Sequence, residues 1–576
     1  MTPEWKIYFA VCSRRVSQAR WSGEWGQRYK KINHRPTDSL RLDLCSERIQ
    51  CFHRIAYERR PHEDNMSTSF GSVLISDPVH ASCGELLARH GIPVTTKHKL
   101  SKEELIKELQ NHDALIVRSE TKVNSEVFAC CPKLRVVGRA GTGVDNIDLE
   151  AATRKGVVVL NTPGGNSISA CELTCALISA LARNVAQAVQ SLKEGRWDRK
   201  LYSGFELSGK TLAVLGMGRI GREVARRMQA FGMRVLAFDP LLTAEDAIQL
   251  DVEKLSLEEI WPLADYITVH TPLIPQTRNL INATTLAKCK KGVRVVNVAR
   301  GGIVDEQALL EALKSGQCAG AALDVFIEEP PKNPVTLQLI AHPNVVATPH
   351  LGASTAEAQE RVAVEIAQQF IALAGKSTEY AVTGIVNAPI LSTAMSDENE
   401  PWIELSKKLG QLAARLLKGK LNVTVRSQTI GCGMQEKAFV HTAVLLGVLS
   451  GQTKNGLNLI NAPTLAREMG IEVEGSHVSA EGKAVLVQVE GHRIKGTVRD
   501  KEPLLLSLDD ASFANGIALG DSVCLYKGNR VQDLAQIVSA FSAKSVNVQS
   551  VNANGNWIIV QSDRDTSIPV NGIESF

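Results

Sequence analysis

Residues 211–239 read TLAVLGMGRIGREVARRMQAFGMRVLAFD, and this stretch decides how the middle of the chain folds. An apolar run enters the pattern Gly216-x-Gly218-x-x-Gly221, and the next apolar run ends at Asp239. This order predicts a strand, a tight glycine turn, a helix and a second strand. In such a unit the first glycine permits the turn, the second lets a phosphate approach the backbone, and the third lets the helix pack closely on the strand.

The same stretch carries the features of a dinucleotide-binding site. The N-terminus of the helix offers free N–H groups and the positive end of the helix dipole to a pyrophosphate. Asp239 follows Gly221 by 18 residues, where a carboxylate can accept hydrogen bonds from both ribose hydroxyls and repel a 2′-phosphate. A glycine-rich turn can also be purely structural, but the flanking strands favour a cofactor, and the acid favours NAD over NADP.

A chain of 576 residues is too long for one hydrophobic core, and domains of the usual size predict roughly three or four. No apolar run reaches the roughly 18 residues that cross a bilayer, and no signal-peptide pattern is present. We therefore expect a cytoplasmic protein that does not bind membranes. The 12 cysteines form no CxxC pairs, which favours free thiols, and we expect no metal ion.

The net charge of +4 is concentrated near the N-terminus. Residues 1–65 contain 13 basic and 8 acidic residues, so the rest of the chain is nearly neutral and offers no basic face for nucleic acid. Three interpretations of residues 1–65 stay open: a disordered extension, a transit-like leader, or a stretch upstream of a true start at Met66. Their acidic residues argue against a transit peptide, so we favour the start at Met66.

Short β-branched strands alternate with helices from residue 73 onward, which predicts the α/β class with doubly wound parallel sheets. The first unit covers residues 71–164, and the second, with the glycine turn, covers 165–348. The amphipathic helix 354–374 should pack back on the first unit. We therefore expect a discontinuous substrate-binding domain that includes 349–375, a dinucleotide-binding domain of the Rossmann type, and a cleft between them.

The chain changes character after residue 376. Residues 386–500 mix an amphipathic helix with strands and contain no phosphate-binding glycine loop. Residues 501–576 contain short strands around a helix at 530–543. We expect two small α+β modules there.

Three residues at predicted strand ends of the second unit suit hydride transfer at a 2-hydroxy acid. His350 can take the hydroxyl proton, because imidazole titrates near working pH. Glu329 can orient the ring and stabilise its protonated form. Arg300 offers a planar set of N–H donors that matches a carboxylate. A single histidine is most often structural, and a surface Arg–Glu ion pair is usually weak. The occurrence of Arg300, Glu329 and His350 together at successive strand ends favours a catalytic site.

The segments GMGRIGREV, HTPLIPQTRNLIN, NVARGGIVDEQAL, ALDVFIEEPP and TPHLGAST resemble the D-isomer-specific 2-hydroxyacid dehydrogenase family. Across residues 72–375 the similarity is greatest to its long, phosphoglycerate-oxidising branch. The two C-terminal modules match that branch's intervening domain and ACT-like regulatory domain. The resemblance implies NAD-dependent oxidation of 3-phosphoglycerate, in the form of 3-phospho-D-glycerate, to 3-phosphohydroxypyruvate. The resemblance further implies that this reaction is the first step of serine biosynthesis and that the enzyme is a homodimer or homotetramer.

The resemblance also assigns individual residues. Arg118 and Arg139 are the favoured candidates for the substrate phosphate, and charge balance on a solvated loop is the alternative interpretation. Substrate is expected against the backbone of Gly141, Thr142 and Gly143, with Asn166 and Ser167 holding the loop geometry. Cofactor contacts beyond Gly216, Gly218, Gly221 and Asp239 are expected at Thr142, Arg219, Ile220, Thr271, Val298, Ala299, Arg300, Asp324, His350, Leu351, Gly352 and Ala353.

Two alternative functions stay open. One is another enzyme of the family, such as a glyoxylate or hydroxypyruvate reductase, but the 200 residues after Lys376 argue against it. The other is an NAD-sensing scaffold similar to the corepressor proteins, but residues 502–576 read as folded strands and helix. The C-terminal module diverges most from the family pattern, so packing between subunits is as good an expectation there as binding of an amino-acid effector.

Overall fold

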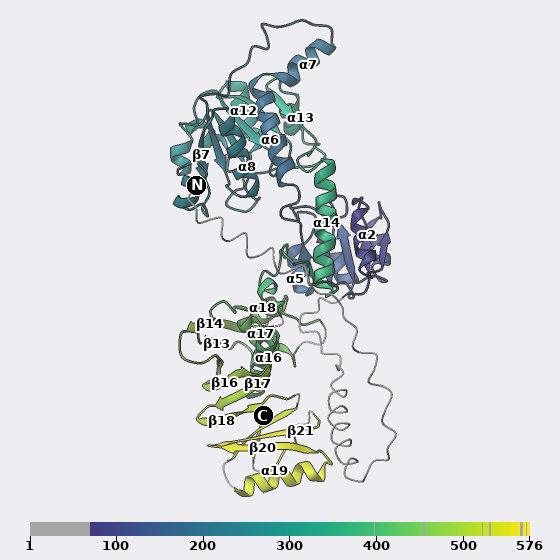
Figure 1. Cartoon of the computed structure of the whole chain (residues 1–576), viewed down its shortest axis with the longest axis vertical. Coiled ribbons are helices and arrows are strands. Elements are labelled where there is room, and N and C mark those ends of the chain that lie inside the picture. Colours follow the sequence, from purple (N-terminus) through teal and green to yellow (C-terminus); the bar gives the residue numbers. More distant parts are fainter. Residues whose placement is uncertain are drawn as a thin grey trace, which may run out of the picture. The chain divides into compact units, whose positions relative to one another are not determined.

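The computed structural model describes residues 70–576, apart from 397, 453–455, 521, 529–530, 565–567 and 572 (Figure 1). The predictions for residues 1–65 and for a start at Met66 lie outside the described residues. The strands of the described residues form two parallel sheets, one mixed sheet and one antiparallel sheet. The two parallel sheets with helices confirm the predicted fold class.

The first sheet has five parallel strands in the order β2-β1-β3-β4-β5. Three of its strands, β1, β3 and β5, are apolar and fully buried, as expected for a parallel sheet covered by helices. The strands are β1 (Val73–Ile75), β2 (Val94–Thr96), β3 (Ala114–Val117), β4 (Val136–Arg139) and β5 (Val158–Leu160). The helices are α2 (Ser82–Arg89), α3 (Lys102–Glu108), α4 (Ser125–Cys130) and α5 (Leu149–Arg154).

Helix α14 (Ala356–Leu373) packs on this first sheet, beside α2 (Figure 1). Val362, Ile366 and Phe370 of α14 lie in the same buried cluster as the strands. A Cβ atom on Gly138 would lie 2.4 Å from Phe370 Cε2, so glycine is what permits the close contact. The helix after His350 therefore packs against the first sheet and α2.

The connector after α14 also joins the first sheet. Leu160 of β5 bridges Ile385 in antiparallel fashion, and the Asn161 N–H donates to the Gly384 carbonyl at 2.9 Å. The buried amide of Gln369 accepts from the Gly384 N–H at 2.7 Å and donates to the Asn161 carbonyl at 2.8 Å. The chain therefore stays on this sheet past residue 375, where the sequence suggested that the domain ends.

The second sheet has seven parallel strands in the order β12-β11-β10-β9-β6-β7-β8. The strands are β6 (Thr211–Leu215), β7 (Arg234–Phe238), β8 (Glu253–Lys254), β9 (Tyr266–Val269), β10 (Val293–Asn297), β11 (Cys318–Leu323) and β12 (Val345–Ala347). The helices are α6 (Ser167–Ala182), α7 (Val185–Lys193), α8 (Arg219–Ala230), α9 (Ala244–Gln249), α10 (Leu257–Ile260), α11 (Ala283–Lys288), α12 (Glu306–Ser315) and α13 (Pro334–Ala341).

Helices α6 and α7 differ in how they meet solvent. Helix α6 is largely buried against the second sheet, whereas Val185, Val189 and Leu192 of α7 are exposed. In the described part of the chain no single helix is long and apolar enough to cross a membrane. Helices α6 and α7 are long and apolar enough only when they are counted as one segment, and the chain bends by 68° between them.

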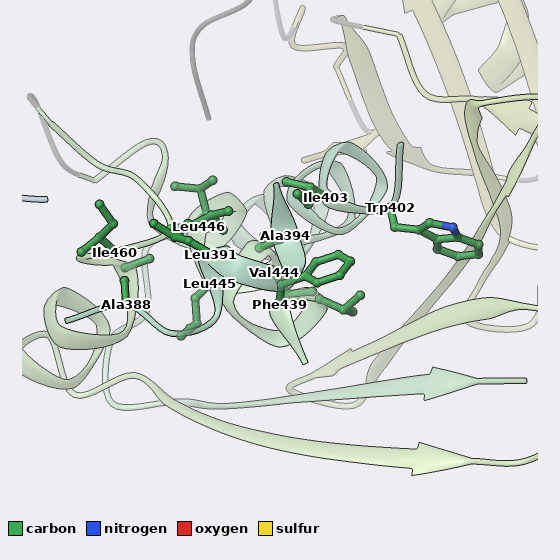
Figure 2. Packing of buried hydrophobic residues seen from close by; sticks show 14 of the residues in the cluster. Ala388, Leu391, Ala394, Trp402, Ile403, Phe439, Val444, Leu445, Leu446 and Ile460 are labelled. Carbon is green, nitrogen blue, oxygen red and sulfur yellow. The ribbon is translucent and has the colours of Figure 1, made fainter. Parts of the chain in front are cut away.

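The third sheet is mixed and six-stranded, in the order β14-β13-β15-β16-β17-β18. Its strands are β13 (Thr424–Ile430), β14 (Glu472–Val478), β15 (Ala484–Val489), β16 (His492–Arg499), β17 (Glu502–Leu508) and β18 (Ala511–Ala518). The accompanying helices are α15 (Leu391–Ala394), α16 (Glu400–Leu417), α17 (Phe439–Leu449) and α18 (Ala462–Glu468). Figure 2 shows Phe439 and Val444 of α17 beside Leu391 and Ala394 of α15 in the apolar cluster of this module.

The last sheet is antiparallel and four-stranded, in the order β20-β21-β19-β22, with one helix, α19 (Val531–Ala543). Its strands are β19 (Val523–Lys527), β20 (Val548–Asn554), β21 (Trp557–Ser562) and β22 (Glu574–Ser575). Strands β17 and β18 pair within the third sheet, so the boundary expected between residues 500 and 501 falls inside that sheet. Successive hairpins look alike in sequence, and only their pairing shows which sheet they join.

Candidate active site

The glycine turn between β6 and α8 has the predicted close approaches. Gly216 has φ +101°, and its Cβ atom would lie 2.6 Å from the His270 carbonyl oxygen. A Cβ atom on Gly221 would lie 2.0 Å from the Gly216 carbonyl oxygen, so helix and strand touch there. Gly218 precedes α8 and has open space within 4 Å of its Cβ position among the described residues. A ligand can therefore reach this backbone and the first N–H groups of α8.

Asp239 lies directly after β7 and beside this turn. Its Oδ2 accepts a hydrogen bond from the Met217 N–H at 2.7 Å, and its Oδ1 accepts one from the Leu241 N–H at 2.8 Å. Each carboxylate oxygen keeps further acceptor capacity, because an ionised carboxylate offers about four lone-pair sites. The acid is thus held in one orientation and can still accept from ribose hydroxyls.

Two further residues of the expected cofactor set are placed near the turn. Thr271 follows β9, and its buried hydroxyl has no hydrogen-bond partner in the described part of the chain. The guanidinium of Arg219 donates to the Pro163 carbonyl at 3.3 Å, in the segment between the two parallel-sheet domains. An unpartnered hydroxyl, open glycine backbone and an oriented carboxylate together fit a dinucleotide.

Glu329 and His350 form a hydrogen-bonded pair. The distance from Glu329 Oε2 to His350 Nδ1 is 2.7 Å, and the Phe326 N–H donates to Glu329 Oε1 at 3.0 Å. Burial disfavours the charged carboxyl of Glu329, but the bonds from His350 and Phe326 outweigh it, so the pKa of Glu329 is lowered. The carboxylate is therefore ionised at neutral pH and faces one ring nitrogen, which leaves Nε2 for substrate.

His350 occupies a strained backbone position. Its φ is +55°, in the left-handed region that non-glycine residues rarely adopt, and its N–H donates to the Asp324 carbonyl at 2.9 Å. Backbone strain of this kind persists only where surrounding contacts hold it, and it clusters at functional sites. The side chain of Asp324 supplies such contacts.

Asp324 is fully buried and binds the loop that carries His350. Its Oδ1 accepts from the Thr348 hydroxyl at 2.6 Å and from the Leu351 N–H at 2.7 Å, while Oδ2 accepts from the Gly352 N–H at 2.8 Å. The sequence suggested Asp324 as a cofactor contact. The structure shows its carboxylate bound to the protein loop at Thr348, Leu351 and Gly352.

Arg300 reaches from the second sheet to the first. Its Nε donates to Asp145 Oδ2 at 3.0 Å and its Nη1 to the Ala299 carbonyl at 2.7 Å. A Cβ atom on Gly143 would lie 1.8 Å from Arg300 Nη2, so the guanidinium lies directly on the glycine segment expected to contact substrate. The sequence did not point to Asp145, because its partner is far away along the chain.

Hydrogen bonds to residues 161–166 hold the glycine segment 141–143 in place. The Thr142 hydroxyl, which has one proton to donate, lies 2.6 Å from Asn166 Oδ1 and 3.1 Å from the Thr162 carbonyl oxygen. Asn161 Nδ2 donates to the Thr142 carbonyl at 2.6 Å. Asn166 thus holds this loop as the sequence suggested. Asn161 was not foreseen.

Arg118 directly follows β3, Arg139 is the last residue of β4, and both lie in one electrostatic cluster with Arg300. Burial, together with the positive charge of Arg300, lowers the pKa of Arg139 to about 10, and Arg139 Nε has no partner among the described residues. Burial likewise lowers the pKa of Arg118, whose Nη1 donates to Gln359 of α14. Three cations gathered with a free donor favour an anionic ligand.

Asp77 orients the segment that follows Arg118. It is buried at the end of β1 and accepts hydrogen bonds from the Arg118 N–H at 2.6 Å and from the Thr121 N–H at 3.0 Å. The sequence analysis missed Asp77 and Gln359. An acid at a strand end was the available signal for Asp77, whereas no sequence pattern links Gln359 to Arg118.

Parallel-sheet domains, a dinucleotide turn and an Arg–Glu–His set define the class of NAD-dependent oxidoreductases that act on hydroxy acids. The family "D-isomer specific 2-hydroxyacid dehydrogenase, NAD binding domain" matches residues 175–352, and "D-3-phosphoglycerate dehydrogenase intervening domain" matches residues 398–504.

Relatives and a solved structure extend this result. The chain is 51% identical over 469 residues to D-3-phosphoglycerate dehydrogenase of Rattus norvegicus, covering 79% of this chain and 86% of that protein. It is 42% identical over 430 residues to the Bacillus subtilis protein of the same name, covering 74% and 80%. A glyoxylate reductase structure from Paecilomyes thermophila is similar with a TM-score of 0.50 and 28% identity, covering 55% of this chain and 98% of that chain. The chain belongs to the D-isomer-specific 2-hydroxyacid dehydrogenase family, with NAD as its cofactor, as the sequence predicted.

Proposed function

We propose that this protein oxidises 3-phospho-D-glycerate to 3-phosphohydroxypyruvate with reduction of NAD, the first step of serine biosynthesis. The observation that supports the reaction is the Glu329–His350 pair at 2.7 Å, with Arg300 lying on the glycine segment 141–143. The relatives named D-3-phosphoglycerate dehydrogenase support the choice of substrate. The buried donor of Arg139 supports a substrate that carries a second anionic group.

The proposed roles follow from the contacts. His350 Nε2 accepts the proton of the C2 hydroxyl, and Glu329 stabilises the imidazolium that results. Arg300 binds the substrate carboxylate in place of Asp145, and the half-buried cations Arg118 and Arg139 bind the phosphate. The glycine turn at 216–221 and Asp239 would hold NAD, whose nicotinamide would supply the acceptor for the hydride from C2.

The proposed cofactor contacts are the same residues that the sequence suggested. The pyrophosphate would lie on the backbone at Gly216 and Gly218 and at the start of α8, where Arg219 and Ile220 stand. Asp239 would accept from the ribose. The remaining proposed contacts are Thr142, Gly221, Thr271, Val298, Ala299, Arg300, Asp324, His350, Leu351, Gly352 and Ala353.

We also propose a cytoplasmic homodimer or homotetramer. The support for an oligomer is a group of exposed apolar side chains on α7 and the segment after it. Exposed apolar surface on a folded protein commonly marks an interface. These side chains are Val185, Val189, Leu192, Trp197, Leu201 and Phe205. Light scattering of the purified protein tests this, and a monomer at micromolar concentration would exclude it.

The reaction is tested with purified protein, NAD and 3-phospho-D-glycerate, with hydrazine to trap the ketone. NADH formation supports the proposal, and its absence would reject it. Unphosphorylated D-glycerate and glyoxylate serve as competing substrates. A preference for either of them would favour a reductase of the same family.

Arg139→Ala tests the phosphate assignment separately. Loss of one charge-assisted hydrogen bond should raise KM for 3-phospho-D-glycerate by roughly 10- to 100-fold. KM for D-glycerate should change little. Arg89→Ala, at an exposed position of α2, is the matched control. Equal effects of Arg139→Ala on both substrates would remove Arg139 from the phosphate site.

A further inference from the structure

Glu306 is a buried carboxylate outside the proposed catalytic set. It is the first residue of α12 and is 7% exposed. It does not cap the helix, because the side chain of Asp305 already accepts from the Ala308 N–H. Its Oε1 accepts from the Ile327 N–H at 2.8 Å, and its Oε2 accepts from the Thr336 hydroxyl of α13. The helix N-terminus favours its negative charge.

The segment that Glu306 holds carries Glu329. The side chain of Ile327 is 61% exposed, so the anchored part is its backbone. One residue earlier, the Phe326 N–H donates to Glu329 Oε1 at 3.0 Å. The orientation of the Glu329 carboxylate toward His350 therefore depends on where the backbone of residues 326–327 lies.

Arg300 is tied to the same segment through its neighbour. A Cβ atom on Gly301 would lie 1.8 Å from the Phe326 carbonyl oxygen and 2.6 Å from the Ile327 nitrogen. The backbone after Arg300 thus packs directly against the backbone that Glu306 anchors. A displacement of residues 326–327 would move Glu329 relative to both Arg300 and His350.

We propose that Glu306 is a positioning residue that sets the carboxylate of Glu329 against His350. The inference rests on the proposed function, because it takes the role of Glu329 from there. Catalytic groups work only when supporting contacts hold them within about half an ångström of the productive geometry. Glu306 provides such a contact through hydrogen bonds and does not touch the reacting atoms.

A double-mutant cycle tests this inference. Glu306→Met keeps the length of the side chain and removes both acceptors. It should lower kcat by roughly 10- to 100-fold in the wild-type background, the effect of a displacement of about 1 Å. In the Glu329→Gln background the same change should lower kcat less than about twofold, because the group through which Glu306 acts is already disabled. KM for substrate and the Kd for NADH should stay within about threefold.

Two variants make the cycle specific. Glu306→Gln keeps an acceptor for the Ile327 N–H and can donate to Thr336, so it should restore kcat to within about threefold of wild type. Asn282→Ala removes the cap of α11, which accepts from the Thr284 and Thr285 N–H groups, and serves as a control that destabilises this domain elsewhere. Glu306→Ala takes the place of Glu306→Met if that variant does not fold.

The outcomes separate the two proposals. Equal losses of kcat in the two backgrounds would overturn the positioning role, and so would a Glu306→Gln variant as slow as Glu306→Met. A Glu329→Gln variant with full kcat would instead overturn the role of Glu329, and the inference about Glu306 with it. A nonadditive cycle with rescue by glutamine supports both.

Discussion

Replacing Asp324 by Asn should destabilise the loop that carries His350. The amide oxygen can keep the two partners of Oδ1, the Thr348 hydroxyl and the Leu351 N–H. The amide NH2 then faces the Gly352 N–H. Both groups are hydrogen-bond donors, so the Gly352 N–H loses its acceptor. The replacement is nearly isosteric, so its effect comes from hydrogen bonding and charge.

The magnitude follows from these three bonds. A buried N–H without a partner costs roughly 1–3 kcal/mol, and each retained bond weakens from a charge-assisted one of about 1.5–3 kcal/mol to a neutral one of about 0.5–1.5 kcal/mol. Removing a buried charge offsets part of this cost. We expect the free energy of unfolding to fall by about 3 kcal/mol, which lowers Tm by roughly 6–12 °C for a domain of this size.

Thermal unfolding followed by circular dichroism measures the change, and steady-state kinetics should show kcat reduced by roughly 10- to 100-fold, because His350 is displaced. Asp305→Asn is the matched control, since Asp305 accepts one bond at a helix cap and asparagine caps nearly as well. An Asp324→Asn protein with wild-type kcat and a Tm within 2 °C would refute the reasoning.

Three further predictions concern the cofactor, the proton and the pH dependence of stability. His350→Ala should lower turnover by roughly 10²- to 10⁴-fold and leave the Kd for NADH, measured by fluorescence titration, nearly unchanged; retained turnover would remove His350 as the acid and base. Asp239→Ala should reduce the preference for NAD over NADP, measured as a ratio of kcat/KM values, and an unchanged ratio would mean that another group reads the ribose. Burial lowers the pKa of His270 from 6.5 to about 4. The stability that comes from burying the neutral imidazole is therefore complete above pH 6.5. It is lost as the pH falls from 6.5 toward 4, because the unfolded chain binds the proton first. His270→Gln should therefore flatten the dependence of Tm on pH between 6.5 and 4, and an unchanged slope would assign that dependence to other groups.

Local signals carried most of the fold prediction. The buried strands of both parallel sheets were readable because a buried parallel strand is an apolar β-branched run bounded by turns. The edge strands β2 and β8 are not buried and were not predicted. The boundaries in the C-terminal part were harder. Nothing local distinguishes the hairpin of β17 and β18 from the strands that follow, and their place in the third sheet is settled by pairing with β16. The connector at Ile385 was missed because a single bridge leaves no periodic pattern.

The sequence by itself determined the glycine turn, the acid at Asp239 and the strand-end positions of Arg300, Glu329 and His350. Each of these depends on residues within one strand–turn–helix unit, where spacing along the chain fixes geometry. Family resemblance added Arg118 and Arg139, which the chain alone did not distinguish from surface charges.

Only the tertiary structure decided which side chains hold these groups in place. Arg300 and its partner Asp145 are 155 residues apart, and Arg118 and Gln359 are 241 residues apart. Such pairs meet because α14 returns to the first sheet and because β10 and β4 end near one another, and packing of whole elements sets both distances. Glu306 reads as an ordinary acid in the sequence, and the family resemblance assigned Asp324 to the cofactor and not to the loop that carries His350. Burial and hydrogen bonds give these two residues their roles: Asp324 accepts three bonds and Glu306 accepts two. Both the burial and the bonding partners depend on the complete fold.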